Sequence, residues 1–285
     1  MWWILIRIGG ITLSLHPLFV IIMLLSVLPG QFLELLTLFA IVLIHEFGHV
    51  RAARMYGLDV VSVQLLPFGG VAVVEDHGRM TAGKEIIIAL AGPLQNAVMS
   101  SAAWLLLSAG WGNAEFLQYL IHANTVIALF NLLPVLPLDG GRIVRAAVSA
   151  VTPYYFTLLW SGRISIAASA GIVAYSLLPL LSGNGPLLNL LLIGGFLLAT
   201  NVQDQRNLPY RFLAFLTHRN TESDRRLAEG GTARPIVAPS AKPLESVLRL
   251  FRRNHYHLIY VVNDQGTIVA VVPEQRLVSS FLRIS

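Results

Sequence analysis

The sequence predicts a polytopic α-helical membrane protein with a small C-terminal α/β domain, and composition supports this fold class. Hydrophobic residues make up 55% of the 285 residues and charged residues only 12%, with a mean hydropathy of +0.68. Soluble domains typically contain about 25% charged residues. The formal net charge of +5 arises from residues 204–285, which hold 12 basic and 7 acidic side chains. Because cysteine is absent, any metal site must use nitrogen and oxygen ligands.

Six apolar runs are long enough to cross a hydrocarbon core of about 30 Å as helices. They comprise residues 11–29, 32–54, 85–109, 116–138, 157–181 and 186–203. Lys and Arg are absent from three alternate connections, residues 28–31, 109–115 and 181–186. By the positive-inside rule these connections face outward. We therefore expect a multi-pass protein of the cell membrane, with about six transmembrane helices and both termini in the cytoplasm.

The pattern changes after residue 203, and three parts are expected along the chain. They are a membrane domain over 1–203, a linker over 204–234 and a soluble domain over 235–285. In the last part, apolar residues at helical spacing precede two strand-like runs, LIYVV and TIVAVV, around the turn NDQG, and a second helix over PEQRLVSSFL. A unit of about 50 residues has only marginal stability on its own, so we expect it to pair with another element.

The second apolar run contains the stretch HEFGH, residues 45–49, although a charge at membrane depth costs at least ~2.5–3.5 kcal/mol. His45 and His49 lie one helical turn apart on one face, so both imidazoles can bind a single ion. Glu46 lies beside that face, where it can reach a metal-bound water. The pattern predicts a metal site with a general base. The alternative is a polar patch that caps the helix end or lines a proton path.

A catalytic zinc site needs a third protein ligand, and Asp139 is the candidate. Inward orientation brings it to the same side of the membrane as the two histidines. Pro134 and Pro137 should interrupt the fourth helix just before it, while Gly140 and Gly141 permit a tight turn. Alone, this stretch would indicate an ordinary Asp-Gly turn. Beside H-E-x-x-H at the same depth, it favours a metal ligand.

Residues 60–76 alternate, are rich in valine and contain two central glycines. They predict a hairpin or re-entrant loop on the cytoplasmic side, in which Phe68 is either a membrane-surface anchor or a substrate contact. Other polar residues in the apolar runs are expected to form hydrogen bonds between helices. These are His16, Gln95, Asn96, His122 and Asn124.

Four motifs carry a family resemblance: HEFGH, LLPFGG (65–70), AGPLQN (91–96) and NLLPVLPLDGG (131–141). In this order within six spans, they resemble the site-2 protease family of intramembrane zinc metalloproteases, and most closely the branch typified by stage IV sporulation protein FB. The resemblance implies that one Zn²⁺ is bound by two histidines and an aspartate, with a glutamate as general base. The matching residues are His45, His49, Asp139 and Glu46.

The resemblance also implies properties of the substrate site. Asn131 and Pro137 would shape the active-site gap, Phe68 would contact substrate or inhibitor, and Asn96 would neighbour the active site. The expected reaction is cleavage of a membrane-associated proprotein near the cytoplasmic face, with an inactive sigma factor of a spore former as substrate. Membrane proteins that hold the protease inactive are implied as partners.

The C-terminal domain resembles a single cystathionine-beta-synthase-type (CBS) motif. Such motifs usually work in pairs and often bind adenine nucleotides such as ATP, which implies homo-oligomerisation through this domain. The stretch RRNHYH also has the basic and aromatic residues of a nucleic-acid site. A basic tail tethered to a membrane is more simply attracted to anionic lipid, so no nucleic-acid partner is expected.

Two other classes of function remain open at this stage. A transporter or proton-relay protein could use the His, Glu and Asp cluster, but it would need polar residues that continue to the outer face. The outer half of the second run offers only Glu34. A catalytically silent scaffold could act through the C-terminal domain, and the intact H-E-x-x-H pattern argues against it.

Overall fold

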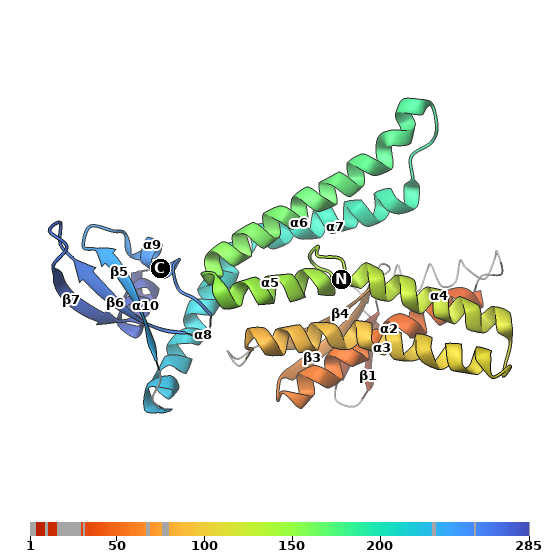
Figure 1. Cartoon of the computed structure of the whole chain (residues 1–285), viewed down its shortest axis with the longest axis horizontal. Helices are drawn as coiled ribbons and strands as arrows, with labels where there is room; N and C mark the ends of the chain where they lie inside the picture. The colour runs from red at the N-terminus through yellow and green to blue at the C-terminus, as the bar shows by residue number, and fades with distance from the viewer. Residues whose placement is uncertain are drawn as a thin grey trace. The chain divides into compact units, whose positions relative to one another are not determined.

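A computed structural model describes the protein as a mainly helical chain with two small β-sheets (Figure 1). The described residues are 4–8, 11–15, 30, 32–66, 69–75, 80–229, 232–253 and 255–284. Met1–Arg79 and Lys84–Ile143 form one compact unit, and Met80–Gly83 and Val144–Ser285 form another. Each unit contains one of the sheets.

Three long helices are the largest elements of the first unit. They are α2 (Phe32–Met55), α3 (Ala82–Ser108) and α4 (Ala114–Asn131). Glu34 in the first turn of α2 and Arg54 in its last turn have the charges that the helix dipole favours. Asn113 caps α4, because its side chain accepts a hydrogen bond of 2.9 Å from the backbone N–H of Phe116.

Three helices of the described chain are long and apolar enough to cross a membrane, namely Phe32–Met55, Ala82–Ser108 and Tyr154–Ser182. They match the second, third and fifth apolar runs of the sequence. The fourth and sixth runs form α4 and α7 (Leu188–Arg206), which have 18 and 19 residues. The protein is a helical membrane protein, and a total of six spans stays a prediction.

The first apolar run begins differently from the expectation. A helix from residue 11 is wrong, because residues 11–15 form the strand β2 (Ile11–Leu15). The sequence ITLSL alternates apolar and polar residues, which is the period of a strand, and pairing with two neighbouring strands satisfies its backbone. The rest of that run, residues 16–29, lies outside the described residues.

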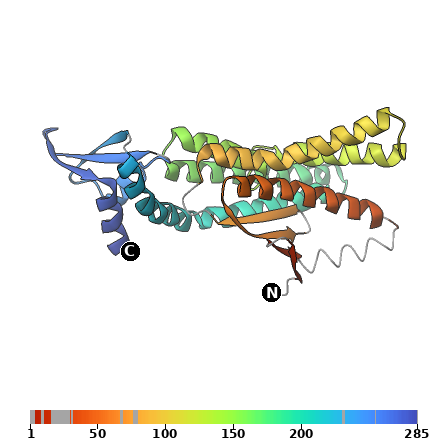
Figure 2. The same cartoon turned by 90° about the horizontal axis from the view of Figure 1, so that it is seen from below.

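The first sheet has the order β1-β2-β3-β4, with β1 (Ile4–Ile8), β3 (Asp59–Leu66) and β4 (Gly69–Glu75) around β2. Neighbouring strands are antiparallel except for the parallel pair β2 and β3. The hairpin predicted over residues 60–76 is present as β3 and β4. Both strands contact α2, which carries the HEFGH stretch (Figure 2). β4 forms an edge of the sheet.

The helix expected over residues 116–138 is interrupted. α4 ends at Asn131, a non-helical segment follows, and α5 (Asp139–Val151) begins at the aspartate. Pro134 and Pro137 explain the interruption, since proline has no N–H for the helix ladder. A Cβ on Gly141 would lie 2.5 Å from the backbone N of Leu136, so glycine lets this segment fold against the first turn of α5.

In the second unit, α6 (Tyr154–Leu177) and α7 form a helical hairpin joined through the 3-10 turn η1 (Leu178–Ser182). Small residues allow the two helices to approach. A Cβ on Gly194 of α7 would lie 2.8 Å from Ile172 Cγ2 of α6. The buried Asn201 of α7 donates a hydrogen bond of 3.0 Å to Ser169 Oγ of α6. Polar side chains join the two helices, as expected of an apolar hairpin.

The C-terminal domain has a three-stranded sheet and three helices. They are α8 (Leu208–Glu229), β5 (Ala233–Pro239), α9 (Leu244–Leu248), β6 (Tyr256–Val262), β7 (Ile268–Pro273) and α10 (Glu274–Ile284). The sheet order is β5-β6-β7, with β5 parallel and β7 antiparallel to β6. The small α/β domain that the sequence predicts is present. The expected linker, residues 204–234, is instead largely the helix α8, and the strand β5 follows it.

Helix α8 completes the core of this domain. Phe212 and Leu216 of α8 are buried in one cluster with Phe251, Ile259 and Val278 from the sheet and its helices. Burying a large apolar side chain contributes about 1.5–3 kcal/mol, so α8 supplies burial that the small sheet could not provide alone. The pairing element expected for this domain is therefore α8.

A buried ion pair also joins α8 to the first residue of α10. Arg219 of α8 donates hydrogen bonds of 3.0 and 2.8 Å to the two carboxylate oxygens of Glu274, and one of 2.8 Å to the backbone oxygen of Arg252. Glu274 also accepts from the backbone N–H of His257 at 2.8 Å. Burial lowers the pKa of His257 and outweighs its hydrogen bond to Glu274, which acts in the opposite direction.

We predict that Arg219→Met destabilises the C-terminal domain by about 3–5 kcal/mol, because it leaves the buried Glu274 carboxylate without its cation. Hydrogen exchange of the β6 amides in the purified protein measures this. Arg249→Met is the matched control, since Arg249 forms an exposed pair with Glu245 and should cost less than about 1 kcal/mol. Equal protection of β6 in wild type and Arg219→Met would contradict the prediction.

Candidate metal centre

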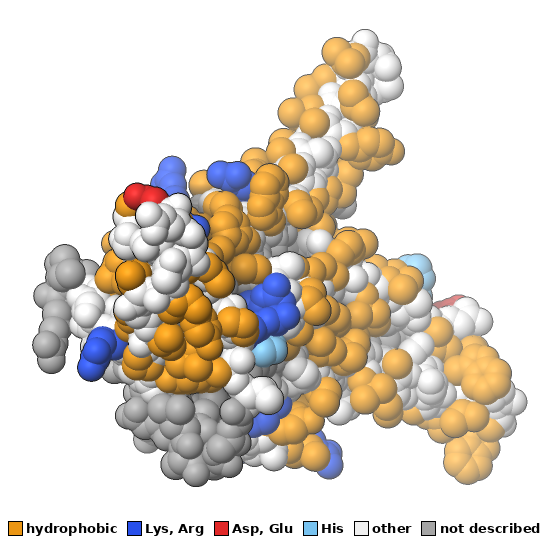
Figure 3. Space-filling model, turned by 60° about the vertical axis from the view of Figure 1, so that its left-hand side comes forward, with side chains coloured by type: hydrophobic (Ala, Val, Ile, Leu, Met, Phe, Trp, Pro, Cys, Tyr) orange, Lys and Arg blue, Asp and Glu red, His pale blue; other side chains and the backbone are white. Residues whose placement is uncertain are grey.

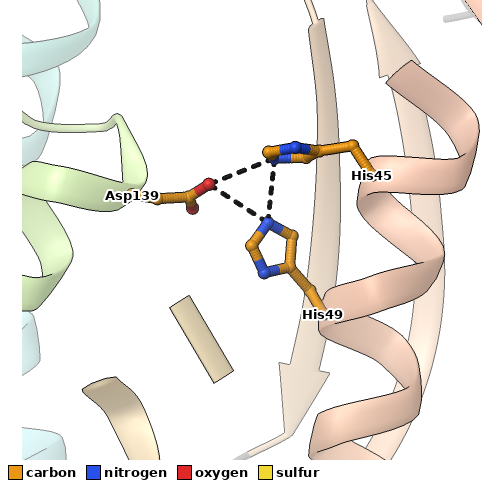
Figure 4. Close-up of side chains that lie close together, drawn as sticks. All are labelled: His45, His49 and Asp139. Carbon is orange, nitrogen blue, oxygen red and sulfur yellow. Dashed lines mark hydrogen bonds and ion pairs between the residues drawn. The ribbon is translucent and has the colours of Figure 1, made fainter. Parts of the chain in front are cut away.

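The structure brings together His45, His49 and Asp139 (Figure 4). The histidines lie one turn apart on α2, and the aspartate is the first residue of α5. His45 Nε2 lies 3.1 Å from Asp139 Oδ2, His49 Nε2 lies 3.2 Å from the same oxygen, and the two Nε2 atoms are 3.2 Å apart. All three side chains are buried. The periodicity of α2 puts both histidines on one face of the helix. The interruption of the fourth apolar run brings the Asp139 carboxylate next to them.

The far side of each imidazole is held by a hydrogen bond. His49 Nδ1 lies 2.7 Å from the backbone oxygen of Ile88, which can only accept, so Nδ1 carries the proton. His45 Nδ1 lies 2.9 Å from Asn96 Oδ1, and the amide NH₂ of Asn96 points to the backbone oxygen of Asn124 at 3.4 Å. In the neutral rings, both Nε2 atoms therefore present lone pairs.

Three electron-pair donors thus face one another in a buried place. Two imidazole lone pairs and a carboxylate oxygen repel each other unless protons or a cation lie among them. Ligand atoms bonded to a tetrahedral zinc at about 2.0–2.1 Å would be about 3.3–3.4 Å apart, close to the sides of the observed triangle. The donor set of two nitrogens and one oxygen leaves a fourth position for water, which fits a catalytic zinc ion.

Gly92 of α3 leaves the space beside these nitrogens open. A Cβ at this position would collide with His49 Nε2 and lie 2.6 Å from His45 Nε2. Gly48 of α2 faces the same helix, and its Cβ would lie 2.6 Å from the backbone oxygen of Ala91. The two glycines let α2 and α3 pack closely without filling the centre.

Glu46 is buried next to His45 in α2, and its carboxylate makes no hydrogen bond to any residue that the structure describes. A carboxylate in this position is available to take a proton from a nearby water. Asp139 Oδ2 faces both imidazoles. Arg142 adds a positive charge 4.0 Å from the other oxygen of Asp139.

The remaining predicted site residues are less closely involved. Asn131 is the last residue of α4, and its side chain donates a hydrogen bond of 3.0 Å to Ile127 of the same helix. Pro137 lies in the non-helical segment just before Asp139 and is half-buried. Phe68 lies outside the described residues.

Helix α3 contributes more to the centre than the sequence predicts. Ile88, Gly92 and Asn96 recur at every fourth position, so they form one stripe on α3 that faces both histidines. Asn96 is expected from the sequence to join helices, and from the resemblance to neighbour the active site; it contacts both His45 and the α4 backbone. The spacing of a glycine and an asparagine within AGPLQN was the available signal.

Comparisons with known proteins agree with this geometry. Residues 33–112 and 107–155 match the family model described as peptidase family M50. Stage IV sporulation protein FB of Bacillus subtilis is 37% identical over 142 residues, which cover 50% of this chain and 49% of that protein. A zinc metalloprotease of Methanocaldococcus jannaschii is 31% identical over 155 residues, which cover 51% and 45% of the two chains.

A solved structure gives the same result. The site-2 protease from Methanocaldococcus jannaschii superposes with a TM-score of 0.57 at 28% identity, over 72% of this chain and 95% of that chain. The matched regions span about half the length of the two curated relatives. Residues 33–155 thus match peptidase family M50, and the chain is similar to stage IV sporulation protein FB in sequence and to a site-2 protease in structure.

We predict that Gly92→Ala reduces the affinity for Zn²⁺ about 10-fold or more, because the added methyl group displaces the two imidazoles. Competition with a chromophoric chelator on purified protein measures the affinity. Gly171→Ala in α6 is the control, since a Cβ there has nothing within 4 Å. Zinc binding by Gly92→Ala equal to that of wild type would contradict the position assigned to the metal.

Proposed function

We propose that this protein is an intramembrane zinc metalloprotease that cleaves a membrane-associated proprotein near the cytoplasmic face. The observation that carries the proposal is the convergence of two imidazole nitrogens and a carboxylate oxygen beside a buried glutamate. The match of residues 33–155 to peptidase family M50 supports the same activity.

In the proposed mechanism, His45, His49 and Asp139 hold one Zn²⁺ ion. When bound, the ion supplies a Lewis acid for the scissile carbonyl and lowers the pKa of a coordinated water toward ~7. Glu46 accepts the proton of the attacking water and then delivers it to the leaving amine. Burial of all four side chains keeps bulk water from competing with substrate.

The proposed topology has six spans, with the metal site toward the cytoplasmic side and both chain termini in the cytoplasm. The distribution of Lys and Arg along the sequence supports this orientation. Catalysis is assigned to residues 1–203, which contain every proposed ligand. In this topology, lipid contacts the outward faces of the helices, where large apolar side chains such as Leu94 and Trp104 of α3 are exposed.

We further propose that substrate binds in an extended conformation at the edge of the first sheet. β4 has one unpaired edge among the described strands and contacts α2, the helix of both proposed histidine ligands. An added strand would gain main-chain hydrogen bonds there. Asn131 and Pro137 would line the path to the metal, and Phe68 would contact substrate or inhibitor.

The proposed substrate class is a membrane-associated precursor such as an inactive sigma factor, with membrane proteins as inhibitory partners. Similarity to stage IV sporulation protein FB supports this assignment. We also assign the C-terminal domain to the CBS type, with an adenine nucleotide such as ATP as its ligand. That assignment rests on the pattern of helix, two strands and helix in residues 244–284.

We propose that the C-terminal domain also mediates homo-oligomerisation. Val237, Tyr260 and Val271 lie opposite one another across the three strands, on the sheet face away from the buried Ile259. Val237 and Val271 are 63% and 52% exposed, and Figure 3 shows a hydrophobic patch on this side of the domain. A second copy of the same face is the proposed occupant, since tethering to one membrane brings two copies together.

A transporter or proton relay is not favoured. Its motivating feature, the His, Glu and Asp cluster, is the part of the chain that matches a peptidase family. A relay also needs a polar path to the outer face, whereas the outer half of α2 has mostly apolar side chains.

We predict that Glu46→Gln keeps bound zinc and lowers the rate of proprotein cleavage by about 10²–10⁴-fold, because it removes the base and leaves the ligands intact. The measurement is cleavage of a membrane-tethered proprotein in co-expressing cells, with metal content determined on both purified proteins. Asp139→Asn is the companion variant and should lose both zinc and cleavage. A wild-type protein without metal, or a Glu46→Gln protein that cleaves normally, would refute the mechanism.

We predict that Val271→Lys converts the oligomer into monomers, because a buried unpaired charge opposes packing of the two sheet faces. Stepwise photobleaching of labelled protein in lipid nanodiscs counts the copies. Gln265→Lys adds the same charge in an exposed turn of the domain and should leave the count unchanged. A monomeric wild type, or an oligomeric Val271→Lys protein, would exclude this interface.

A further inference from the structure

Asn96 of α3 is fully buried and contacts two other helices. Its Oδ1 lies 2.9 Å from His45 Nδ1 on α2, and its NH₂ group donates to the backbone oxygen of Asn124 on α4 at 3.4 Å. The second contact determines the orientation of the amide. With NH₂ directed at a backbone carbonyl, only the oxygen of Asn96 can face the imidazole.

This contact determines the tautomer of His45. An imidazole that donates from Nδ1 carries its lone pair on Nε2, the nitrogen that faces Asp139 and His49. The other tautomer would direct an N–H into the proposed metal position. Partners of this kind also orient the ring of a metal ligand, and their loss typically costs 10–100-fold in metal affinity.

The two histidines differ in the group that fixes their tautomer. His49 uses the backbone oxygen of Ile88, which no side-chain substitution removes. His45 depends on a side chain, and the amide supplies an acceptor without adding a third negative charge to the buried Glu46 and Asp139. Asn96 is therefore the position at which the ligand geometry of the centre can be changed by substitution outside the ligands.

We propose that Asn96 is a positioning residue that holds His45 in the Nδ1-protonated tautomer and directs its Nε2 at the metal. The inference rests on the proposed metal site. It predicts that Asn96 acts through its oxygen acceptor, and that its bridge between α3 and α4 contributes little to metal affinity.

The test compares Zn²⁺ affinity, measured by chelator competition, in wild type, Asn96→Ala, Asn96→Asp and Ser100→Ala. Asn96→Ala should bind about 10–100-fold more weakly, and Asn96→Asp, which keeps an acceptor oxygen, should recover most of that loss. Ser100 lies one turn along α3, and its hydroxyl contacts Thr125 of α4 at 3.4 Å. Ser100→Ala removes a bridge between the same helices and should bind zinc like wild type.

The visible spectrum of the Co²⁺-loaded protein gives a second readout, because its band intensities report ligand geometry. We expect altered bands for Asn96→Ala and wild-type bands for Ser100→Ala. Equal affinity of wild type and Asn96→Ala would overturn the inference, and so would equal losses in the Ala and Asp variants. Absence of zinc binding by wild type would instead overturn the proposed function, so the two failures are distinguishable.

Discussion

The first unit is organised around one electrostatic constraint, the close approach of two imidazole nitrogens and a carboxylate oxygen in a buried position. Sides of 3.1 to 3.2 Å between three electron-pair donors are unfavourable without a positive charge among them. The surrounding helices must therefore hold the donors in place. The contacts of α3 to both rings, and the start of α5 at Asp139, are what this geometry requires.

Glycine and proline residues allow the close approach of the two histidines and Asp139. Larger side chains at the glycine positions would keep the helices apart. Gly48 and Gly92 allow α2 and α3 to approach until backbone and ring atoms touch. The prolines before Asp139 end one helix, and Gly141 lets the chain fold against the next. Interrupted helix is tolerated in membrane proteins where it is buried or lines a cavity, and here it places Asp139 at the candidate metal centre.

The second unit shows a different use of a buried charge. Arg219 and Glu274 form a hydrogen-bonded pair that attaches α8 to the start of α10, supported by the apolar contacts of Phe212 and Leu216. A segment rich in charge and placed between two domains has the composition of a linker. Packing against a small sheet that lacks sufficient core of its own makes it part of the domain instead.

The sequence by itself determined the membrane class, the residues that converge at the candidate metal centre and the small C-terminal domain. These depend on local signals: apolar run length, the i and i+4 spacing of His45 and His49, and alternating strands. Tertiary structure alone decided that residues 11–15 pair as a strand, that α8 joins the C-terminal core, and that Asn96 contacts His45. Each of these outcomes depends on partners distant in the chain, which local periodicity does not identify.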